Sequence, residues 1–251
     1  MDLGLKDRVY IVTGGTRGLG RATADVLVAE GAKVVIASRD QGHVDAAETA
    51  LGPAAHGVVA DNADPGTPQR LVEAARAAFD RLDGALISVG GPPAGQAMER
   101  TENEWTAAFQ SVFLGAARLA TLLGRELGDG GAIAFVLSTS VKQPLGGLAI
   151  SNGLRPGLAM LAKTLADELG PSGIRVNGLL PGSVDTDRVR ELDARHDDPA
   201  AARARAEAGI PLRRYGRPEE FGRAAAFLLS PAAAYITGAM LPVDGGITRG
   251  L

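Results

Sequence analysis

The sequence of 251 residues has no cysteine and is poor in tyrosine, histidine and lysine, with three, three and four of each. The absence of cysteine excludes disulfides, thiolate nucleophiles, iron–sulfur clusters and cysteine zinc sites. The histidines, His43, His56 and His196, are far apart and show no metal-ligand spacing, so we predict no metal site. A net charge of −3 argues against a nucleic-acid partner.

Signals for export or membrane insertion are also lacking. The first residues, MDLGLKDR, are acidic and mixed, unlike the basic segment and apolar stretch of a secretory leader. The longest uncharged stretch, residues 224–243, is interrupted by Ser230-Pro231 and Thr237-Gly238, which is atypical of a membrane span. We therefore expect a cytoplasmic protein that acts on a small molecule and has no membrane partner.

Short apolar runs alternate with longer amphipathic segments along almost the whole chain. The predicted strands are residues 8–12, 33–37, 57–60, 84–88, 132–137, 174–180 and 239–243. The predicted helices are residues 19–30, 67–81, 102–126, 152–169 and 218–229. Strands without polar alternation are typical of parallel sheets covered on both faces. The pattern predicts the α/β class, with a Rossmann-type doubly wound parallel sheet of about seven strands and helices on both faces.

No linker rich in proline, serine or charge divides the sequence, so residues 1–251 are predicted to form one domain. Residues 183–210 interrupt the alternation, because they are charged and longer than a connection after the sixth strand requires. Their place at the carboxyl end of a strand favours a lid over the ligand site, although a solvated surface helix has the same composition. Asp185 and Asp187 at its base could serve as acids, but helix N-terminal capping is the favoured interpretation.

Glycine is abundant, with 34 residues, and several glycines follow the first predicted strand in the run Thr13-Gly14-Gly15-Thr16-Arg17-Gly18-Leu19-Gly20. Glycines at this point allow a sharp turn and bring backbone N–H groups against a pyrophosphate at a helix N-terminus. The run therefore predicts a dinucleotide site. Its cofactor-binding residues are expected to be Gly14, Thr16, Arg17, Gly18, Leu19 and Gly20.

The end of the second strand indicates which dinucleotide is bound. A carboxylate there accepts from the ribose 2′-hydroxyl of NAD, whereas a 2′-phosphate requires cations. The strand ends with Ser38 and Arg39, and Arg17 lies in the glycine loop opposite. Two guanidiniums and a hydroxyl suit a phosphate, so we expect NADP(H) in preference to NAD(H).

Further motifs follow in a fixed order, and they resemble those of the short-chain dehydrogenase/reductase family over essentially the whole chain. They are Asp61-Asn62, Ser88-Val89-Gly90, Arg175-Val176-Asn177, Pro181-Gly182 with Thr186, Ile210-Pro211-Leu212, Gly216 to Glu220, Thr237-Gly238 and Val243 to Gly246. The resemblance implies adenine contacts at Asp61 and Asn62 and cofactor contacts at Ser88 and Gly90. It further implies that Pro181, Gly182, Val184 and Thr186 hold the nicotinamide amide. It also implies a homodimer or homotetramer.

The catalytic positions depart from that resemblance. Members of the family use a tyrosine as acid, a lysine four residues later, a serine thirteen residues earlier and an asparagine on the preceding helix. Aligned on Leu161-Ala162-Lys163 and Glu168-Leu169-Gly170, these positions hold Ser151, Arg155, Ser138 and Val112 respectively. No shift of register restores the pair, because the only tyrosines are Tyr10, Tyr215 and Tyr235.

These replacements change what the site can do. Ser151 is at best a hydrogen-bond donor, while Ser138 can orient an oxygen of the substrate. Arg155 can reach the cofactor ribose, but it stays charged and cannot relay a proton. Lys142 could supply a proton from a partly desolvated pocket, although an exposed loop lysine is at least as common. Asn152 together with Arg155 could bind an anionic or carbonyl-bearing ligand.

The sequence therefore predicts an NADP(H)-dependent oxidoreductase that acts on a small carbonyl or alcohol substrate with a non-standard proton donor. Ser138, Ser151, Arg155 and Lys142 are its candidate catalytic residues. Two alternatives stay open, because the family's acid is missing. One is a non-redox isomerase, cyclase or lyase on the same scaffold, and the other is a non-catalytic subunit that binds NADP(H).

Overall fold

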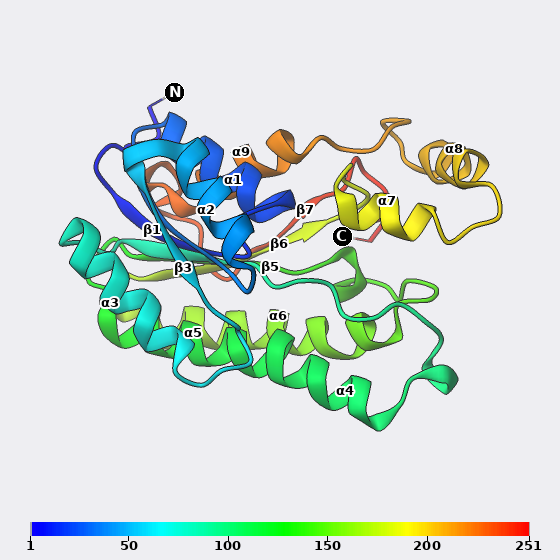
Figure 1. Cartoon of the computed structure of the whole chain (residues 1–251), viewed down its shortest axis with the longest axis horizontal. Coiled ribbons are helices and arrows are strands. Elements are labelled where there is room, and N and C mark those ends of the chain that lie inside the picture. Colours follow the sequence, from blue (N-terminus) through cyan, green and yellow to red (C-terminus); the bar gives the residue numbers. More distant parts are fainter. Residues whose placement is uncertain (1, 251) are drawn as a thin grey trace.

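A seven-stranded parallel sheet forms the centre of the computed structural model, which describes residues 2–250 (Figure 1). Its strand order is β3-β2-β1-β4-β5-β6-β7, and every neighbouring pair is parallel. The strands are β1 (Val9–Thr13), β2 (Lys33–Ser38), β3 (Ala55–Val59), β4 (Gly84–Ile87), β5 (Ala132–Val136), β6 (Arg175–Pro181) and β7 (Met240–Val243). This arrangement confirms the predicted Rossmann-type fold class.

Helices cover both faces of the sheet (Figure 1). One face carries α3 (Thr67–Phe79), α5 (Gly115–Glu126) and α6 (Ala149–Leu169), while the other carries α1 (Gly18–Ala29), α2 (Gln41–Leu51) and α9 (Pro218–Leu229). Helix α4 (Glu102–Ala108) continues into α5 through a π-helical turn, Phe109–Leu114. Helices α7 (Asp187–Asp193) and α8 (Pro199–Gly209) lie beyond the carboxyl ends of the strands.

Alternate residues of each strand pack into two separate cores. On β1, Val9 and Ile11 face the layer of α3, α5 and α6, whereas Tyr10 and Val12 face α1 and α9. All four side chains are fully buried. A strand buried on both faces must be apolar at every position, which is why the central strands lack polar alternation.

The order of the strands fixes where a ligand binds. The chain leaves β1 toward β2 and β3 on one side and later returns to β4 on the other side. The carboxyl ends of β1 and β4 therefore frame the crevice where ligands bind in open α/β sheets. The glycine run follows β1 and Ser88 follows β4, so both border this crevice.

Two elements at the edge of the sheet differ from the sequence prediction. Helix α2 was not predicted, because its sequence has a glycine near its start and buries only Val44 and Ala47. Strand β3 begins two residues before the predicted run, at Ala55, and includes His56. Both elements lie at the edge of the sheet, where burial is partial and the hydrophobic signal is correspondingly weak.

Within residues 2–250, the helical segment Glu102–Glu126 is the one long and apolar enough to cross a membrane. The buried residues of this segment, among them Leu119, Ala120 and Leu123, belong to the core beside the sheet. Its apolar composition is thus the kind that a core helix requires. The uncharged stretch 224–243 is divided among α9, a short turn and β7.

Candidate active site

The glycine run forms a tight loop at the N-terminus of α1. Gly14 and Gly18 have φ angles of +59° and +58°, which side-chain-bearing residues rarely adopt. A Cβ on Gly20 would overlap the carbonyl oxygen of Gly14, so the helix can approach the strand only with glycine there. The first turn of α1 has no acidic residue, and Arg17 at its N-cap gives no side-chain cap. This loop fits a dinucleotide pyrophosphate, because no side chain caps the N–H groups at the start of α1 and the glycines themselves add no Cβ.

Thr13 and Ser88 join the two strand ends that frame the crevice. The Thr13 hydroxyl donates to the Ser88 carbonyl oxygen at 2.8 Å and accepts from the Ser88 N–H at 2.8 Å. Beyond β3, Asp61 accepts from the N–H of Ala63 at 2.9 Å, and Asn62 lies against Gly115 at the start of α5. Gly90 is exposed in the loop after β4.

The end of β2 presents cations and no free carboxylate. Arg17 and Arg39 are both exposed, and neither side chain pairs with a carboxylate among the described residues. The nearest acid in sequence, Asp40, caps α2 by accepting from the His43 N–H at 2.8 Å. Ser38 is partly buried at the strand end.

The residues predicted to hold the nicotinamide amide follow β6 and are fixed by backbone pairing. The Gly182 N–H donates to Val243 at 3.1 Å, and Val184 forms an isolated bridge with Gly216. The position of a Cβ on Gly18 lies 3.8 Å from the Thr186 methyl group, so this segment borders the glycine loop. Pro181, Gly182, Val184 and Thr186 thus lie beside the predicted pyrophosphate site.

Three serine hydroxyls gather where β5 meets α6. Ser138 begins the short turn Thr139–Val141, and its Oγ accepts from the Ser140 N–H at 3.1 Å. The Oγ atoms of Ser140 and Ser151 lie 3.4 Å apart, with Ser140 4% and Ser151 6% exposed. Ser140 was not predicted from the sequence, and its one signal is that it is the second serine of the Ser-Thr-Ser run, residues 138–140. We call Ser138, Ser140 and Ser151 the serine cluster.

Arg155 lies one helical turn after Ser151, on the same face of α6. Its side chain is 6% exposed, and Nη1 donates to the carbonyl oxygen of Val136 at 2.7 Å. Burial alone lowers the pKa of this guanidinium to about 10, because no charged group contributes. Near neutral pH the residue is therefore a buried cation, which agrees with the expectation that it cannot relay a proton.

Neither Lys142 nor Val112 supplies the group that its position was expected to provide. Lys142 is exposed in the loop before α6, so the desolvated pocket expected for a lysine acid is not present around it. Val112 occupies the π-helical turn and is 2% exposed, within the core. Its side chain offers no polar atom at the position where the family has an asparagine.

None of the three tyrosines replaces the missing catalytic acid. The Tyr10 hydroxyl donates to Leu229 at 3.2 Å in the opposite core, and burial raises the pKa of Tyr10 to about 12. Burial, together with Asp193, raises the pKa of Tyr215 to about 12. Tyr235 is fully exposed on the surface. The two shifted phenols hold their protons too tightly to act as acids near neutrality.

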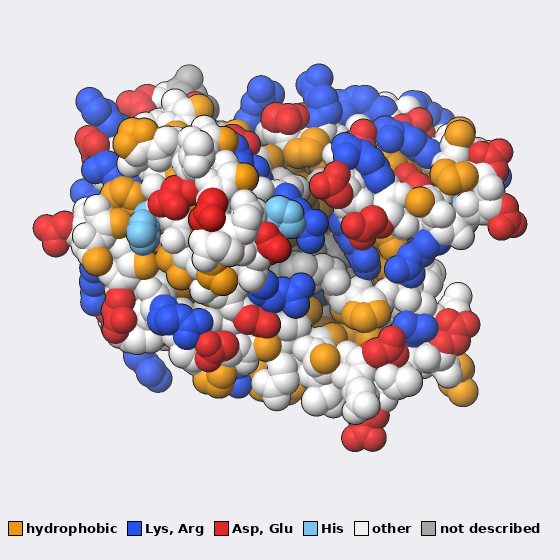
Figure 2. Space-filling view, viewed as in Figure 1, with side chains coloured by type: hydrophobic (Ala, Val, Ile, Leu, Met, Phe, Trp, Pro, Cys, Tyr) orange, Lys and Arg blue, Asp and Glu red, His pale blue; other side chains and the backbone are white. Residues whose placement is uncertain are grey.

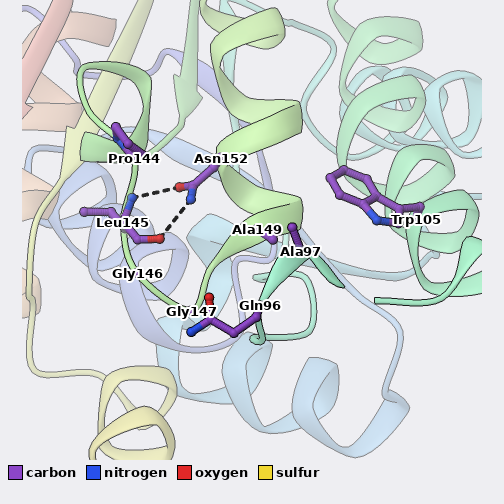
Figure 3. Close-up of a pocket in the computed structure, with 9 residues that line it drawn as sticks. All are labelled: Gln96, Ala97, Trp105, Pro144, Leu145, Gly146, Gly147, Ala149 and Asn152. Atoms are coloured by element: carbon purple, nitrogen blue, oxygen red, sulfur yellow. Dashed lines mark hydrogen bonds between the residues drawn. The ribbon is translucent and has the colours of Figure 1, made fainter. Parts of the chain in front are cut away.

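A pocket of about 510 Å³ lies at the N-terminal end of α6 (Figure 3). The residues that line it are Gln96, Ala97, Trp105, Pro144, Leu145, Gly146, Gly147, Ala149 and Asn152. Asn152 is turned toward the loop, where its side chain accepts from the Leu145 N–H at 3.1 Å and donates to the Leu145 carbonyl at 2.8 Å. The Asn152 side chain therefore holds the loop, and its role in ligand binding stays a prediction.

The predicted lid segment, residues 183–210, contains α7 and α8 and touches the opposite wall of the crevice. Arg188 donates to the Pro92 carbonyl oxygen at 2.9 Å. The capping interpretation of the two acids at the base is wrong, because α7 has Thr186 at its N-cap with no side-chain cap. Asp185 instead pairs with Arg190 of α7 and Arg203 of α8, at 3.0 and 3.2 Å, and these ion pairs connect the two helices.

Basic side chains border this crevice. Figure 2 shows a hollow in the middle of the face, below α7 and α8, with Lys and Arg side chains on both of its sides. Acidic side chains are present as well, since several of the lid arginines are paired with them. The crevice, the glycine loop and the parallel sheet together define a dinucleotide-binding protein of the Rossmann class.

Comparison with known proteins specifies the family. The family model described as enoyl-(acyl carrier protein) reductase matches residues 14–248. An uncharacterized oxidoreductase of Mycobacterium tuberculosis is 36% identical, over 97% of this chain and 93% of that protein. The 3-oxoacyl-[acyl-carrier-protein] reductase of Escherichia coli is 32% identical, over 98% of this chain and 99% of that protein. The structure of L-sorbose reductase from Gluconobacter frateurii with NADPH and L-sorbose is 28% identical, covers 100% of both chains and superposes with a TM-score of 0.92.

The chain belongs to the short-chain dehydrogenase/reductase family, as its motifs indicated. Its relatives are oxidoreductases, and the family binds a nicotinamide cofactor.

Proposed function

We propose that this protein is an NADP(H)-dependent oxidoreductase that interconverts a small carbonyl compound and its alcohol with a non-standard proton donor. The observation that carries the proposal is the uncapped glycine loop at the crevice between β1 and β4. A bound nicotinamide supplies or accepts the hydride. The chain has kept a loop that only glycine allows, which supports continued use of a dinucleotide.

The preference for NADP(H) is supported by the charges at the end of β2. Arg17 and Arg39 have no carboxylate partner among residues 2–250, and Asp40 is engaged in capping α2. A 2′-phosphate would satisfy both guanidiniums with charge-assisted hydrogen bonds. The structure of the related L-sorbose reductase contains NADPH, which agrees with this assignment.

The serine cluster and Arg155 take the place of the family's phenol and lysine. Hydroxyl groups donate hydrogen bonds but do not ionise near neutral pH, so they orient the substrate oxygen without acting as its acid. We assign the proton to the bulk solvent, which delivers it through a water molecule that the serine hydroxyls hold in the crevice and which replaces the proton that this water gives up. Lys142 stays a candidate from the sequence, but its exposure favours water as the donor.

The first experiment measures cofactor binding and turnover separately. NADPH, NADP⁺ and NADH are titrated into the purified protein by fluorescence, and panels of ketones and secondary alcohols are then screened at the nicotinamide absorbance band. We expect NADPH to bind more tightly than NADH and at least one panel to be turned over. Absence of dinucleotide binding would remove the proposal. In an active preparation, Ser138→Ala and Ser140→Ala should lower kcat, whereas Lys142→Ala should not.

A second function is favoured by the loss of the acid, the lysine and the asparagine together, at Ser151, Arg155 and Val112. A non-redox isomerase, cyclase or lyase would use the serine cluster and Arg155 to polarise its substrate without hydride transfer. A non-catalytic subunit would bind NADP(H) as a ligand only. Tight NADPH binding with no turnover on any panel would favour these alternatives over the oxidoreductase.

We further propose a cytoplasmic homodimer or homotetramer. Phe109 and Met160 on α4–α6 are 40% and 65% exposed, and Phe109 stacks on Phe113 with ring centroids 5.3 Å apart. The small residues Ala159, Ala162 and Ala166 of α6 pack into the chain's own core, so they are not available to an interface. Sedimentation of the wild type and of Met160→Glu tests assembly, and fractionation of the producing cells tests location.

A further inference from the structure

The buried guanidinium of Arg155 has no counter-ion. None of the carboxylates among residues 2–250 pairs with it, and only burial acts on its pKa. Transfer of a cation out of water without a partner is costly, and buried charges in proteins are usually paired. A ligand with negative charge would complete this site.

The hydrogen bonds of Arg155 are also incomplete. Only Nη1 has a partner, the Val136 carbonyl oxygen at 2.7 Å. Nε and Nη2 have none among the described residues, and neither is sealed from solvent. These two nitrogens form one edge of the planar guanidinium, which is the edge that binds both oxygens of a carboxylate.

Arg175 shows what a structural arginine looks like in the same fold. It is 8% exposed, and its terminal nitrogens contact four carbonyl oxygens, those of Leu228, Leu229, Ser230 and Ile236. Its position is the start of β6, at the opposite end of the sheet from the crevice. Arg155 has similar burial but a single partner, and it lies at the crevice end beside the serine cluster.

We propose that the substrate of this site carries a carboxylate, which Arg155 binds through its free edge with the hydroxyls of Ser140 and Ser151 beside it. The proposal rests on the proposed function, because it names the substrate class of the same site. The dinucleotide does not meet this need, since its phosphates are expected at the glycine loop and at Arg17 with Arg39, after β1 and β2. The cofactor ribose that Arg155 can reach offers hydroxyl groups, which carry no charge and leave the guanidinium without a counter-ion. Arg155 lies beyond β4, at the junction of β5 and α6.

Calorimetry with two probes of equal size tests this proposal without turnover. Cyclohexanecarboxylate and cyclohexanecarboxamide are titrated into the protein, once alone and once saturated with NADP⁺. We expect the carboxylate to bind at least about tenfold more tightly than the amide in both states. Equal affinities, or no binding of the carboxylate at tens of millimolar, would overturn the proposal. Failure of NADP⁺ to bind would count against the proposed function alone.

Variants then assign the preference to Arg155. Arg155→Gln should abolish the preference for the carboxylate, and Arg155→Lys should keep part of it, because lysine retains the charge but not the planar fork. Lys163→Gln is the matched control on the same helix, since Lys163 is exposed and donates to Gly238 far from the cluster. A preference that persists in Arg155→Gln, or is lost in Lys163→Gln, contradicts the assignment. Thermal unfolding of each variant verifies that it is folded.

Discussion

A side chain on Gly20 would overlap the carbonyl oxygen of Gly14, so the first turn of α1 and the end of β1 touch through backbone alone. We predict that Gly20→Ala displaces the loop and weakens NADPH binding by about 1–3 kcal/mol, roughly fivefold to 150-fold. The reason is that the loop N–H groups no longer converge on the pyrophosphate. Fluorescence titration of NADPH measures the loss.

Gly170→Ala is the control for this effect. Gly170 has helical backbone angles, and a Cβ added there would meet no atom within 4 Å, so the substitution should leave NADPH affinity unchanged. Unchanged affinity in Gly20→Ala would show that the loop does not bind the pyrophosphate.

Arg39 determines the choice of dinucleotide if the 2′-phosphate lies at the end of β2. We predict that Arg39→Ala weakens NADPH binding by about 1.5–3 kcal/mol and leaves NADH binding unchanged, because only NADPH carries the phosphate. Arg21→Ala is the control, since Arg21 lies on α1 and is already paired with Asp25 at 2.8 Å. An equal loss for both dinucleotides in Arg39→Ala would assign this residue to a different contact.

The sheet was predictable because its signal is local. The central strands β1, β4 and β5 are short, mostly apolar runs, and burial on both faces requires nothing more specific. The edge elements α2 and β3 were missed or shifted because the hydrophobic effect contributes less to them. The π-helical turn at Val112 was not predicted, because the apolar spacing of residues 102–126 does not show where a wider turn enters the helix.

The site was predictable in its positions but not in its orientations. Counting from Lys163 placed Ser151 and Arg155 on one face of α6, because helical spacing is fixed. Whether Asn152 points to the ligand or to Leu145 depends on the loop conformation, which spacing does not determine. The position of Ser140 in the cluster depends on the turn after Ser138, which sequence spacing does not predict.

Arg155 and Arg175 should respond in opposite ways to the same substitution. We predict that Arg155→Met leaves the free energy of unfolding unchanged or raises it by up to about 3 kcal/mol, because an unpaired buried cation is removed. Arg175→Met should lower it by about 2 kcal/mol or more, because four carbonyl contacts lose their donor. Urea unfolding near neutral pH measures both. A strong destabilisation by Arg155→Met would mean that this residue is structural.

Glu220 makes the stability of the C-terminal part dependent on acid pH. Arg214 donates to both of its carboxylate oxygens at 2.7 and 2.8 Å, and this pairing, with the Arg217 N–H, lowers the pKa of Glu220 from 4.5 to about 2. A depressed carboxyl pKa stabilises the fold above the unfolded value and loses that effect as pH falls through the folded value. We therefore predict that Glu220→Gln lowers the unfolding temperature at neutral pH.

The gap between wild type and Glu220→Gln should be constant above pH 4.5 and should shrink as pH falls toward 2. Glu219→Gln is the matched control, because Glu219 is the exposed neighbour in the same first turn of α9 and should show no pH-dependent gap. Calorimetric unfolding at several pH values measures both variants. A gap that stays the same down to the lowest pH at which the protein is folded would mean that the Glu220 side chain stabilises α9 by packing and not by its charge.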